Sequence, residues 1–351
     1  MTRTPCFEDI LAALVGGREL VPEQMRWVMR EVMAGRCGEA EAAAFLVGLS
    51  MKGETAAEIA AAAEVLREHM VRLETGRDDV LDTCGTGGDG AGTFNISTAA
   101  ALVAAGAGVA VVKHGNRAAS GKSSSADVMA ALGVCVEGDE AAARRCLDQA
   151  GMAFCFAPRF HPALRHVAPL RRRLRVRTLF NCLGPLANPA LAPYQLLGVG
   201  RPELLDPLAG ALARLGTSRA LLVSGHDGLD EVSLSAPTRV REVRGQQVRE
   251  WEWRPADFGL APCSPEDLRA DGPEESAALI RAVLAGEPGP AARVVLANAA
   301  AALLAAERVE TLGQGVVLAA EAVASGRARQ VLDRLAACSH EPGPEAKAPL
   351  T

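Results

Sequence analysis

A glycine-rich stretch in the first third of the chain carries the residues whose chemistry is easiest to interpret. Residues 82–90 read DTCGTGGDG; an apolar run that predicts a strand precedes them, and residues 95–98, NIST, predict the N-terminus of a helix. Glycine lets backbone N–H groups approach a phosphate closely, and the N-terminus of a helix adds partial positive charge. The stretch therefore predicts an anion-binding loop.

Three of these glycines also fit the GxGxxG spacing of a dinucleotide site, and a structural turn without any ligand is a further alternative. Against a dinucleotide, Asp89 places a carboxylate inside the loop, where it would face a pyrophosphate. The next predicted strand ends in Lys-His at 113–114, whereas a nicotinamide site has an acid near that position for the ribose. A sugar phosphate suits the loop better, because Asp89 can accept a hydrogen bond from a ribose hydroxyl or hold a metal-bound water.

A second loop, residues 111–127, combines three cations, one histidine and four hydroxyl groups between a predicted strand and a predicted helix. Polar and cationic groups at the carboxyl ends of parallel strands line the crevice in which α/β proteins bind ligands. We expect Lys113 and the hydroxyls of residues 123–125 to bind phosphate oxygens, and Asn116 to reach the acceptor. A solvated surface lysine and a structural histidine are the alternatives that need no ligand.

Two further clusters could bind the rest of a phosphorylated substrate. Asp230 and Glu231 follow an apolar run and a turn with two glycines, and Mg²⁺ prefers one or two carboxylates together with phosphate oxygens and water. Six arginines lie between residues 165 and 177, and an arginine supplies the fork of N–H donors that a carboxylate needs. An exposed acidic turn and a solvated or salt-bridged basic helix face remain as alternatives.

The elements that would position these residues show two different patterns. From residue 7 to about residue 73, apolar residues recur at helical spacing, which predicts an all-helical unit of about four helices. After residue 77, short β-rich runs alternate with Ala-rich helical stretches, which predicts βαβ units around a mainly parallel sheet. The predicted strands are residues 80–84, 109–112, 153–156, 195–199 and 220–223.

The predicted fold class is α/β, with a small N-terminal all-helical domain and a larger α/β domain built on a mainly parallel central sheet. An Arg- and Pro-rich segment interrupts the alternation, and we expect its helices to return to the small domain beside a cleft. The expected division is residues 1–74 for the helical domain, joined by helices from about 162–189; residues 75–161 and 190–339 for the α/β domain; and residues 340–351 for a disordered tail.

Bulk composition weighs against several classes of function. The formal net charge is −5, from 37 Lys and Arg against 42 Asp and Glu, so the whole molecule has no attraction for nucleic acid or an anionic membrane. Nine cysteines, odd in number and without a CxxC pair, indicate reduced thiols rather than disulfides or a zinc site. The N-terminal residues hold no uninterrupted hydrophobic region, so we expect a cytoplasmic protein with no membrane partner.

Taken together, the two loops resemble a known family. The string GTGGDG-x-x-TFNIST at 85–98, followed by KHGNR-x-x-S-x-KS-x-SAD at 113–127, is similar to the anthranilate phosphoribosyltransferases of tryptophan biosynthesis. The similarity continues through Arg171, RTLFNCLGPLANP at 177–189 and DGLDE at 227–231, so it spans most of the chain. The departures from the family's usual pattern are Gly121, Ser124, Cys182 and Ala187.

The resemblance implies an enzyme that moves the 5-phosphoribosyl group of phosphoribosyl pyrophosphate (PRPP) to the amino group of anthranilate, releasing pyrophosphate. It also implies the nucleoside phosphorylase/phosphoribosyltransferase type of fold, two Mg²⁺ ions per subunit, and a homodimer joined through the helical domain. The residues implied to contact PRPP are Gly85, Gly88, Asp89, Thr93, Asn95, Ile96, Ser97, Thr98, Lys113, His114, Gly115, Asn116, Arg117 and Ser125.

Smaller sets of residues are implied for the other ligands. The residues implied for anthranilate are Gly85, Asn116 and Arg171, and those implied for Mg²⁺ are Ser97, Asp230 and Glu231. The implied catalytic residues are Lys113, Asn116 and Arg171, with His114 as a helper in orientation or proton removal. Because an aniline-type nitrogen is unprotonated at neutral pH, we expect no dedicated general base.

Two other functions remain open on the sequence. A pyrimidine-nucleoside phosphorylase shares the architecture and a glycine loop, but its loop lacks the Asp89 and TFNIS pattern. A non-catalytic relative that binds nucleic acid is the second alternative; the net charge of −5 and the intact acid pair weigh against it.

Overall fold

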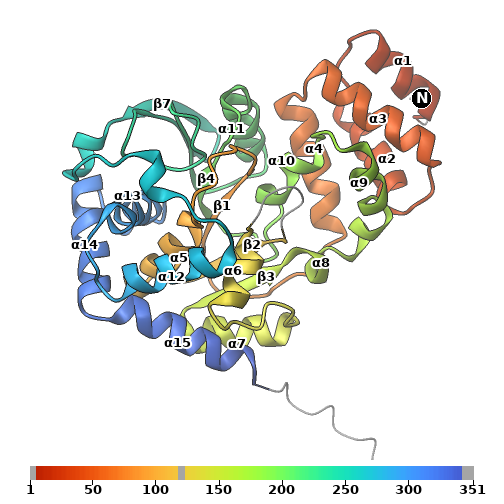
Figure 1. Ribbon diagram of the computed structural model, residues 1–351. Helices are drawn as coiled ribbons and strands as arrows, with labels where there is room; N and C mark the ends of the chain where they lie inside the picture. Colours follow the sequence, from red (N-terminus) through yellow and green to blue (C-terminus); the bar gives the residue numbers. More distant parts are fainter. Residues whose placement is uncertain (1–4, 118–122, 342–351) are drawn as a thin grey trace, which may run out of the picture.

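The computed structural model describes residues 5–117 and 123–341, which form an all-helical part beside an α/β part (Figure 1). Pro22 occupies the first position of its helix, and the Thr55 hydroxyl accepts the Glu58 N–H and so caps another. The helical part begins with α1 (Phe7–Val15), α2 (Pro22–Met33), α3 (Glu39–Lys52) and α4 (Ala56–Glu68). The predicted N-terminal all-helical unit is confirmed.

The α/β part is built on one sheet with the strand order β3-β2-β1-β4-β5-β6-β7. Its strands are β1 (Leu81–Gly85), β2 (Val111–Gly115), β3 (Met152–Phe156), β4 (Tyr194–Gly198), β5 (Arg219–Gly225), β6 (Thr238–Arg244) and β7 (Gln247–Trp253). Neighbours from β3 to β5 pair in parallel, which confirms the predicted mainly parallel sheet, whereas β5, β6 and β7 pair antiparallel. The strand order reverses between β1 and β4, and such a switch point opens a crevice at the carboxyl ends of the strands.

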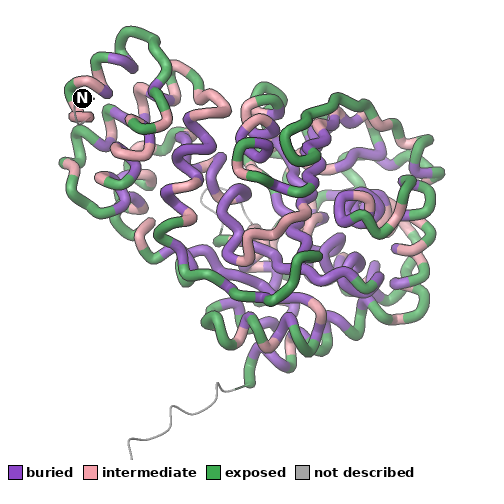
Figure 2. The backbone as a smooth tube through the Cα atoms, turned by 180° about the vertical axis from the view of Figure 1, so that it is seen from behind, coloured by how far each residue is buried: buried purple, intermediate pink, exposed green. Residues whose placement is uncertain are grey.

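Successive residues of the central strands pack against different layers. Leu221 belongs to the apolar core that includes α5 (Ile96–Gly106) and α13 (Pro290–Ala305), whereas Leu222 belongs to the core of the helical part. Figure 2 shows buried residues running from the helical part through the sheet. One face of the sheet therefore shares its core with the helical part.

Small residues let the helices of the α/β part pack closely. A Cβ on Gly106 would lie 2.6 Å from the Ala328 Cα, and a Cβ on Gly315 would lie 2.8 Å from the Ala300 Cα. The other α-helices are α6 (Ser125–Ala131), α7 (Glu140–Ala150), α8 (Ala157–Phe160), α9 (Ala168–Leu174), α10 (Phe180–Leu183), α11 (Leu205–Arg214), α12 (Pro273–Leu284), α14 (Leu312–Ala324) and α15 (Arg327–Ser339). The 3-10 helices are η1 (Pro162–His166), η2 (Gly184–Leu186), η3 (Pro202–Leu204), η4 (Pro255–Phe258) and η5 (Pro265–Leu268).

The segment between β3 and β4 lies against the helical part (Figure 1). Its η1 contacts α2, α9 contacts α3, and α10 contacts α4. Val167, Leu170 and Leu179 are buried in the same apolar cluster as α2 and α4. The chain therefore passes from the sheet to the helical part and back before it forms β4.

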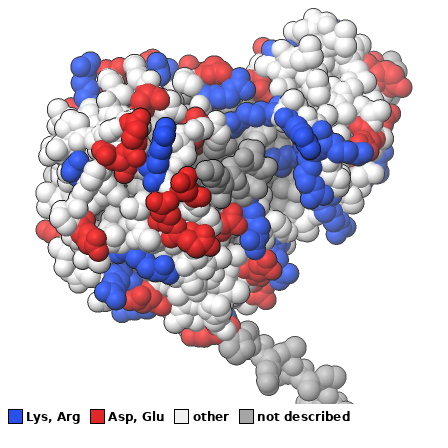
Figure 3. Space-filling model, viewed as in Figure 1, with Lys and Arg blue, Asp and Glu red and all other residues white. Residues whose placement is uncertain are grey.

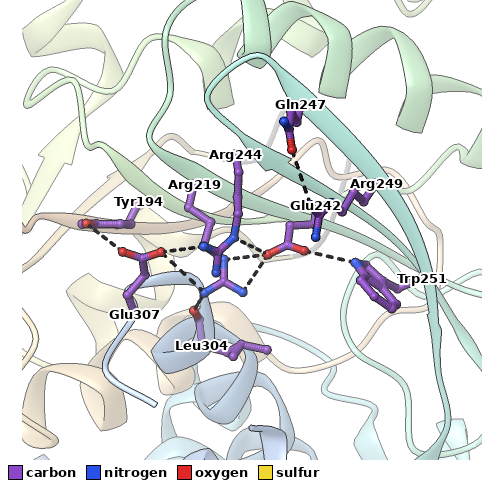
Figure 4. Close-up of polar contacts among 9 residues, drawn as sticks. All are labelled: Tyr194, Arg219, Glu242, Arg244, Gln247, Arg249, Trp251, Leu304 and Glu307. Carbon is purple, nitrogen blue, oxygen red and sulfur yellow. Dashed lines mark hydrogen bonds and ion pairs between the residues drawn. The ribbon is translucent and has the colours of Figure 1, made fainter. Parts of the chain in front are cut away.

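A cluster of paired charges joins β5, β6 and α13 at the amino end of β5 (Figure 4). The side chains of Arg219 and Glu242 are 7% and 9% exposed, and Arg219 Nη2 lies 2.7 Å from Glu242 Oε1. Glu242 also accepts from Arg244 Nε at 2.9 Å and from Trp251 Nε1 at 3.1 Å, while Arg219 donates to the Leu304 carbonyl. Burial by itself raises the pKa of Glu242, but the hydrogen bond from Arg244 and the charge of Arg219 outweigh it and hold this pKa below its usual value.

Charge and hydropathy of the described residues agree with the bulk composition. Within residues 5–117 and 123–341, no helix is both long and apolar enough to cross a membrane. Basic and acidic side chains are interspersed over the face drawn in Figure 3. This mixture of signs fits a chain whose formal net charge is only −5.

Candidate active site

The glycine-rich loop and the acid pair meet at the carboxyl end of the sheet. Asp230 Oδ2 accepts the Gly87 N–H at 3.1 Å, and the Asp230 backbone nitrogen lies 3.5 Å from Asp89 Oδ2. A Cβ on Gly198, the last residue of β4, would lie 1.7 Å from the Asp230 carbonyl oxygen, so a larger residue there would collide with the acid-pair loop. The structure therefore brings together two clusters that lie 143 positions apart in the sequence.

Lys113 is buried at the same end of the sheet. It belongs to β2 and is 1% exposed; its ammonium group donates to the Thr83 carbonyl and, at 3.1 Å, to the Ser97 hydroxyl. Burial lowers the pKa of Lys113, while the charges of Asp82 and Glu231 act in the opposite direction. Lys113 thus places a positive charge between β1, the start of α5 and the acid pair.

The acid pair lies in an environment that disfavours its charge. Burial raises the pKa of Asp230 to about 7, and the nearby Asp89 carboxyl group adds to this shift. Burial also raises the pKa of Glu231 well above its usual value; the charge of Asp230 adds to that shift and the charge of Lys113 opposes it. Buried acids with raised pKa values are typical of functional sites, where a bound cation can compensate the negative charge of the carboxylates.

The available ligands suit magnesium but do not complete its coordination. The carboxylates of Asp230 and Glu231 and the hydroxyl of Ser97 are oxygen groups of the kind that Mg²⁺ prefers, and the Ser97 backbone at the start of α5 acts to lower the pKa of Glu231. Among the described residues, no group of three or more His, Cys, Asp or Glu side chains is arranged to hold a metal ion. An ion bound here would therefore take further ligands from water or from phosphate oxygens.

The start of α5 is fixed by hydrogen bonds to its first residues. Asn95 caps the helix through Oδ1, which accepts the Thr98 N–H at 3.1 Å, and the Asn95 N–H donates to Ser276 of α12 at 2.8 Å. Thr98 Oγ1 is buried and has no partner within the described part of the chain. The Ile96 side chain is 1% exposed and packs in the core, while Thr93 forms an isolated β-bridge with the segment that precedes α12.

The structure describes the second loop except for residues 118–122, which include Gly121. The Arg117 guanidinium lies 3.2 Å from both Asp127 and Glu137, and Asn116 Oδ1 accepts the Arg117 N–H at 2.8 Å. Arg117, which the family resemblance assigns to PRPP, is therefore paired with acids of its own neighbourhood in this structure.

Three consecutive serines lead from this loop into α6. The Ser124 hydroxyl caps α6, accepting the Asp127 N–H at 3.3 Å and donating to the Asp127 carboxylate at 2.6 Å. Ser125 Oγ lies against Gly115, where a Cβ would be only 2.3 Å away. Ser123 Oγ is buried with no partner among the residues that the structure describes. Ser123 therefore has unused hydrogen-bonding capacity that a phosphate oxygen could take up.

His114 faces the segment between the two parts of the molecule. Its Nδ1 lies 3.1 Å from the Gly184 carbonyl oxygen, and because a carbonyl only accepts, Nδ1 carries the proton. Its ring centre lies 4.9 Å from that of His161. Burial lowers the pKa of His114 to about 3 and that of His161 to about 4. Both imidazole rings are therefore neutral near pH 7.

The guanidinium group of Arg171, in α9, has no acidic partner among the residues that the structure describes. Its Cζ lies 5.4 Å from the centre of the Phe180 ring, a cation–π distance. Within the described residues it forms no ion pair, and burial alone lowers its pKa. An arginine in this state can bind a carboxylate from a ligand at little structural cost.

Arg177 contacts the glycine-rich loop, although its sequence context does not predict this role. Its Nη2 donates to the Thr86 and Gly87 carbonyls at 3.1 Å and 2.8 Å. Gly88 has a φ of +80°, which residues other than glycine rarely adopt, and a Cβ there would also lie 1.9 Å from Arg177 Nη1, so a glycine suits the point where the guanidinium crosses the loop. Arg177 ties the segment before β4 to the loop after β1. The only sequence signal for it is its place in the RTLFN string at 177–181.

Comparison with known proteins agrees with this arrangement. The family model described as the helical bundle domain of a glycosyl transferase family matches residues 8–70, and the a/b domain of the same family matches residues 77–329. The anthranilate phosphoribosyltransferase of Symbiobacterium thermophilum is 50% identical over 331 residues, which cover 94% of this chain and 97% of that protein. These values establish the family.

Solved structures give the same result. The crystal structure of anthranilate phosphoribosyltransferase (TrpD) from Thermus thermophilus has a TM-score of 0.89 and 47% identity, covering 95% of this chain and 100% of that one. The Saccharomyces cerevisiae enzyme in complex with PRPP and Mg has a TM-score of 0.87 and 27% identity, covering 95% and 97% of the two chains. With the family models, the relative and both structures in agreement, the chain belongs to the anthranilate phosphoribosyltransferase family of glycosyl transferases.

Proposed function

We propose that this chain carries out the reaction for which its family is named, transferring the 5-phosphoribosyl group of PRPP to the amino group of anthranilate in tryptophan biosynthesis. The observation that carries the proposal is the hydrogen bond of 3.1 Å from the Gly87 N–H to Asp230 Oδ2. This contact supports the proposal because it brings the loop that we propose to bind phosphate next to a carboxylate that we propose to bind metal. Lys113 lies on the neighbouring strand and adds positive charge there.

The phosphate groups of PRPP would lie between the glycine-rich loop and the start of α5. The Thr98 hydroxyl, in the first turn of α5, supports this because it is buried without a partner among the described residues. Ser123 Oγ of the second loop is buried and unpaired in the same way and could bind another phosphate oxygen. A helix N-terminus and glycine N–H groups favour the same anion. The PRPP contacts that we propose are those implied by the family: Gly85, Gly88, Asp89, Thr93, Asn95, Ile96, Ser97, Thr98, Lys113, His114, Gly115, Asn116, Arg117 and Ser125.

Ser97, Asp230 and Glu231 would hold Mg²⁺, and we propose two ions per subunit. The bound metal would neutralise the negative charge of the departing pyrophosphate. Burial is the main cause of the raised pKa of Asp230, and a bound cation would offset this effect by stabilising the ionised carboxylate. Lys113 and the loop N–H groups would stabilise the leaving group from the protein side, so that catalysis comes mainly from electrostatics and positioning.

Anthranilate would be held by its carboxylate. Arg171 supports this role because, within the described residues, it has no acidic partner, and Gly85 and Asn116 would complete the pocket. The aniline nitrogen needs no general base at neutral pH. Burial lowers the pKa of His114 to about 3, so we give this residue a role in orientation rather than in proton removal.

The proposed assembly is a cytoplasmic homodimer joined through the helical domain. Val15 of α1 and Met51 of α3 are 90% and 84% exposed, and a partner subunit could cover such apolar side chains. We keep the division into residues 1–74, 75–161 with 190–339, and a joining segment near 162–189 as part of this proposal. The proposed disordered tail, 340–351, lies almost wholly outside the described residues.

The fluorescence of anthranilate gives the test. With PRPP and Mg²⁺ present, the purified chain should lower the fluorescence of anthranilate as this substrate is consumed. One pyrophosphate should be released for each anthranilate consumed. Phosphorolysis of a pyrimidine nucleoside without any consumption of anthranilate would overturn the proposal in favour of a nucleoside phosphorylase.

A further inference from the structure

The acid pair lies on a loop with little regular structure of its own. Residues 226–237 join β5 to β6 and contain no strand or helix. The Asp230 backbone N–H is held only weakly, by Asp89 Oδ2 at 3.5 Å. Like charges on Asp230, Glu231 and Asp89 repel one another, so this loop needs anchors that do not depend on the acids themselves.

One buried side chain supplies such an anchor. Asn298 of α13 is 0% exposed; its Oδ1 accepts the Val232 N–H at 2.9 Å and its Nδ2 donates to the Val232 carbonyl at 3.0 Å. Nδ2 also donates to the Val294 carbonyl, one helical turn earlier, at 2.9 Å. Val232 directly follows Glu231, and its N–H belongs to the peptide unit that joins the two residues. Asn298 therefore fixes the orientation of the peptide groups on both sides of Val232, next to the acid pair, from the buried helix α13.

The surroundings show that Asn298 is not there for packing. Its neighbours one turn away on the same face of α13, Val294, Val295, Ala301 and Ala302, are all 0% exposed, so an apolar residue would suit this position. Asparagine is a weak helix former, and burying its amide is unfavourable unless the amide is hydrogen-bonded. Here Asn298 replaces a strand partner for Val232, whose two backbone groups would otherwise be buried and unpaired.

We infer that Asn298 is a positioning residue for the metal site: by holding both backbone groups of Val232, it keeps Asp230 directed at the glycine-rich loop and Glu231 near Lys113 and the start of α5, and so sets the affinity for Mg²⁺–PRPP. The inference rests on the proposed function of the acid pair as metal ligands. Asn298 itself touches the loop backbone, on the side of α13 that faces the sheet, and takes no part in the chemistry.

The test measures binding rather than turnover. Isothermal titration calorimetry with PRPP and Mg²⁺, in the absence of anthranilate, compares the unaltered chain with Asn298→Ala and with the milder Asn298→Ser. We expect Asn298→Ala to weaken Mg²⁺–PRPP by roughly tenfold, equivalent to about 1.4 kcal/mol, and Asn298→Ser to weaken it less. The anthranilate KM at saturating Mg²⁺–PRPP should stay close to that of the unaltered chain.

Hydrogen exchange supplies a second measurement. In Asn298→Ala, a peptide that covers residues 229–234 should exchange faster, because the Val232 N–H has lost its acceptor. Ser339→Ala is the matched control: Ser339 of α15 is also a buried polar side chain that binds a loop N–H, that of Cys135 at 2.9 Å, but it lies beside α7, away from the acid pair. This control should bind Mg²⁺–PRPP normally.

A folded Asn298→Ala that binds Mg²⁺–PRPP as tightly as the unaltered chain would overturn the inference. Variants that are all unfolded would also overturn it, because Asn298 would then serve the fold rather than the site. A third variant, Asp230→Asn/Glu231→Gln, separates this failure from that of the proposed function. If the double variant binds Mg²⁺–PRPP normally, the assignment of Asp230 and Glu231 as metal ligands is wrong. If the double variant loses affinity and the Asn298 variants do not, only the role inferred for Asn298 is wrong.

Discussion

The two ends of β5 use the same residue types in opposite ways. At its amino end, Glu242 lies between Arg219 and Arg244, and the charges of these partners hold the pKa of Glu242 below its usual value even though burial acts against them (Figure 4). At its carboxyl end, Asp230 and Glu231 lie beside a third acid, and burial raises the pKa of both. One cluster is complete within the chain, and the other is not.

Unpaired polar atoms follow the same division. Thr98 Oγ1 in the first turn of α5, Ser123 Oγ before α6 and Ser224 Oγ near the carboxyl end of β5 are buried without partners among the described residues. The other such atoms are Asp82 Oδ2, His114 Nε2, both ring nitrogens of His161 and Thr178 Oγ1. Buried polar groups normally find partners, so a concentration of unpaired ones indicates a place prepared for a ligand. The contrast separates a site that stabilises the fold from one that binds and reacts.

The largest effect should come from neutralising the acid pair. Asp230→Asn/Glu231→Gln should lower kcat/KM on the order of 10²–10³-fold, because the pyrophosphate leaving group loses its metal-mediated stabilisation. At pH 8 the same variant should unfold at a higher denaturant concentration, since it no longer buries two like charges. Full activity at limiting Mg²⁺ would rule out this choice of ligands.

A smaller effect on one substrate should follow from Arg171→Ala. Loss of a charged hydrogen-bond partner should raise the KM for anthranilate by roughly 10–100-fold and leave the KM for PRPP nearly unchanged. The exposed neighbour Arg172→Ala is the control and should leave both KM values unchanged. Equal changes in the two KM values for Arg171→Ala would refute the assignment, as measured by steady-state kinetics.

At the amino end of β5, a substitution should lower the stability of the protein and leave its activity unchanged. Glu242→Gln should destabilise the protein by about 3 kcal/mol in urea unfolding, because it removes the nearest charge partner of the buried Arg219 and leaves it with the more distant Glu307, at 4.0 Å. Its activity at 25 °C should match that of the unaltered chain. A loss of Mg²⁺–PRPP affinity without any loss of stability would contradict the division between the two ends.

The pH dependence of stability should differ between the unaltered chain and Asp230→Asn. The folded-state pKa of Asp230, about 7, lies above its reference value of 3.8, so its favourable contribution is present below pH 4 and is lost as pH rises toward 7. His114 and His161, with lowered pKa values, contribute the opposite slope, but they do so in both proteins. The difference in free energy of unfolding should therefore grow by a few kcal/mol between pH 4 and pH 8 in metal-free buffer. A constant difference would show that Asp230 titrates normally.

Much of the fold follows from local patterns in the sequence. The five parallel strands are short apolar runs, and their loops carry glycines and polar residues at the carboxyl ends. The antiparallel strands β6 and β7 were not predicted, because adjacent charged residues at 241–242 and 249–250 interrupt the alternation of apolar and charged residues, and because β7 is largely exposed. A pattern that buries so little gives a weak strand signal.

The site was predicted only where neighbours in sequence are neighbours in space. The glycine-rich loop and the acid pair could each be identified from their own residues, and the strand order explains why they meet. Arg177 and Asn298 could not be identified, since each acts through one side chain on the backbone of a distant loop. The same limit applies to Arg117, whose pairing with Asp127 and Glu137 depends on how its loop turns.

The most direct test of the central claim is a crystal structure of this chain with PRPP and Mn²⁺ in place of Mg²⁺, with the metal located by its anomalous scattering. We predict a peak bonded to a carboxylate of Asp230 or Glu231 and to pyrophosphate oxygens that the Gly85–Asp89 loop also contacts. Manganese bound to the pyrophosphate but away from both carboxylates would contradict the account.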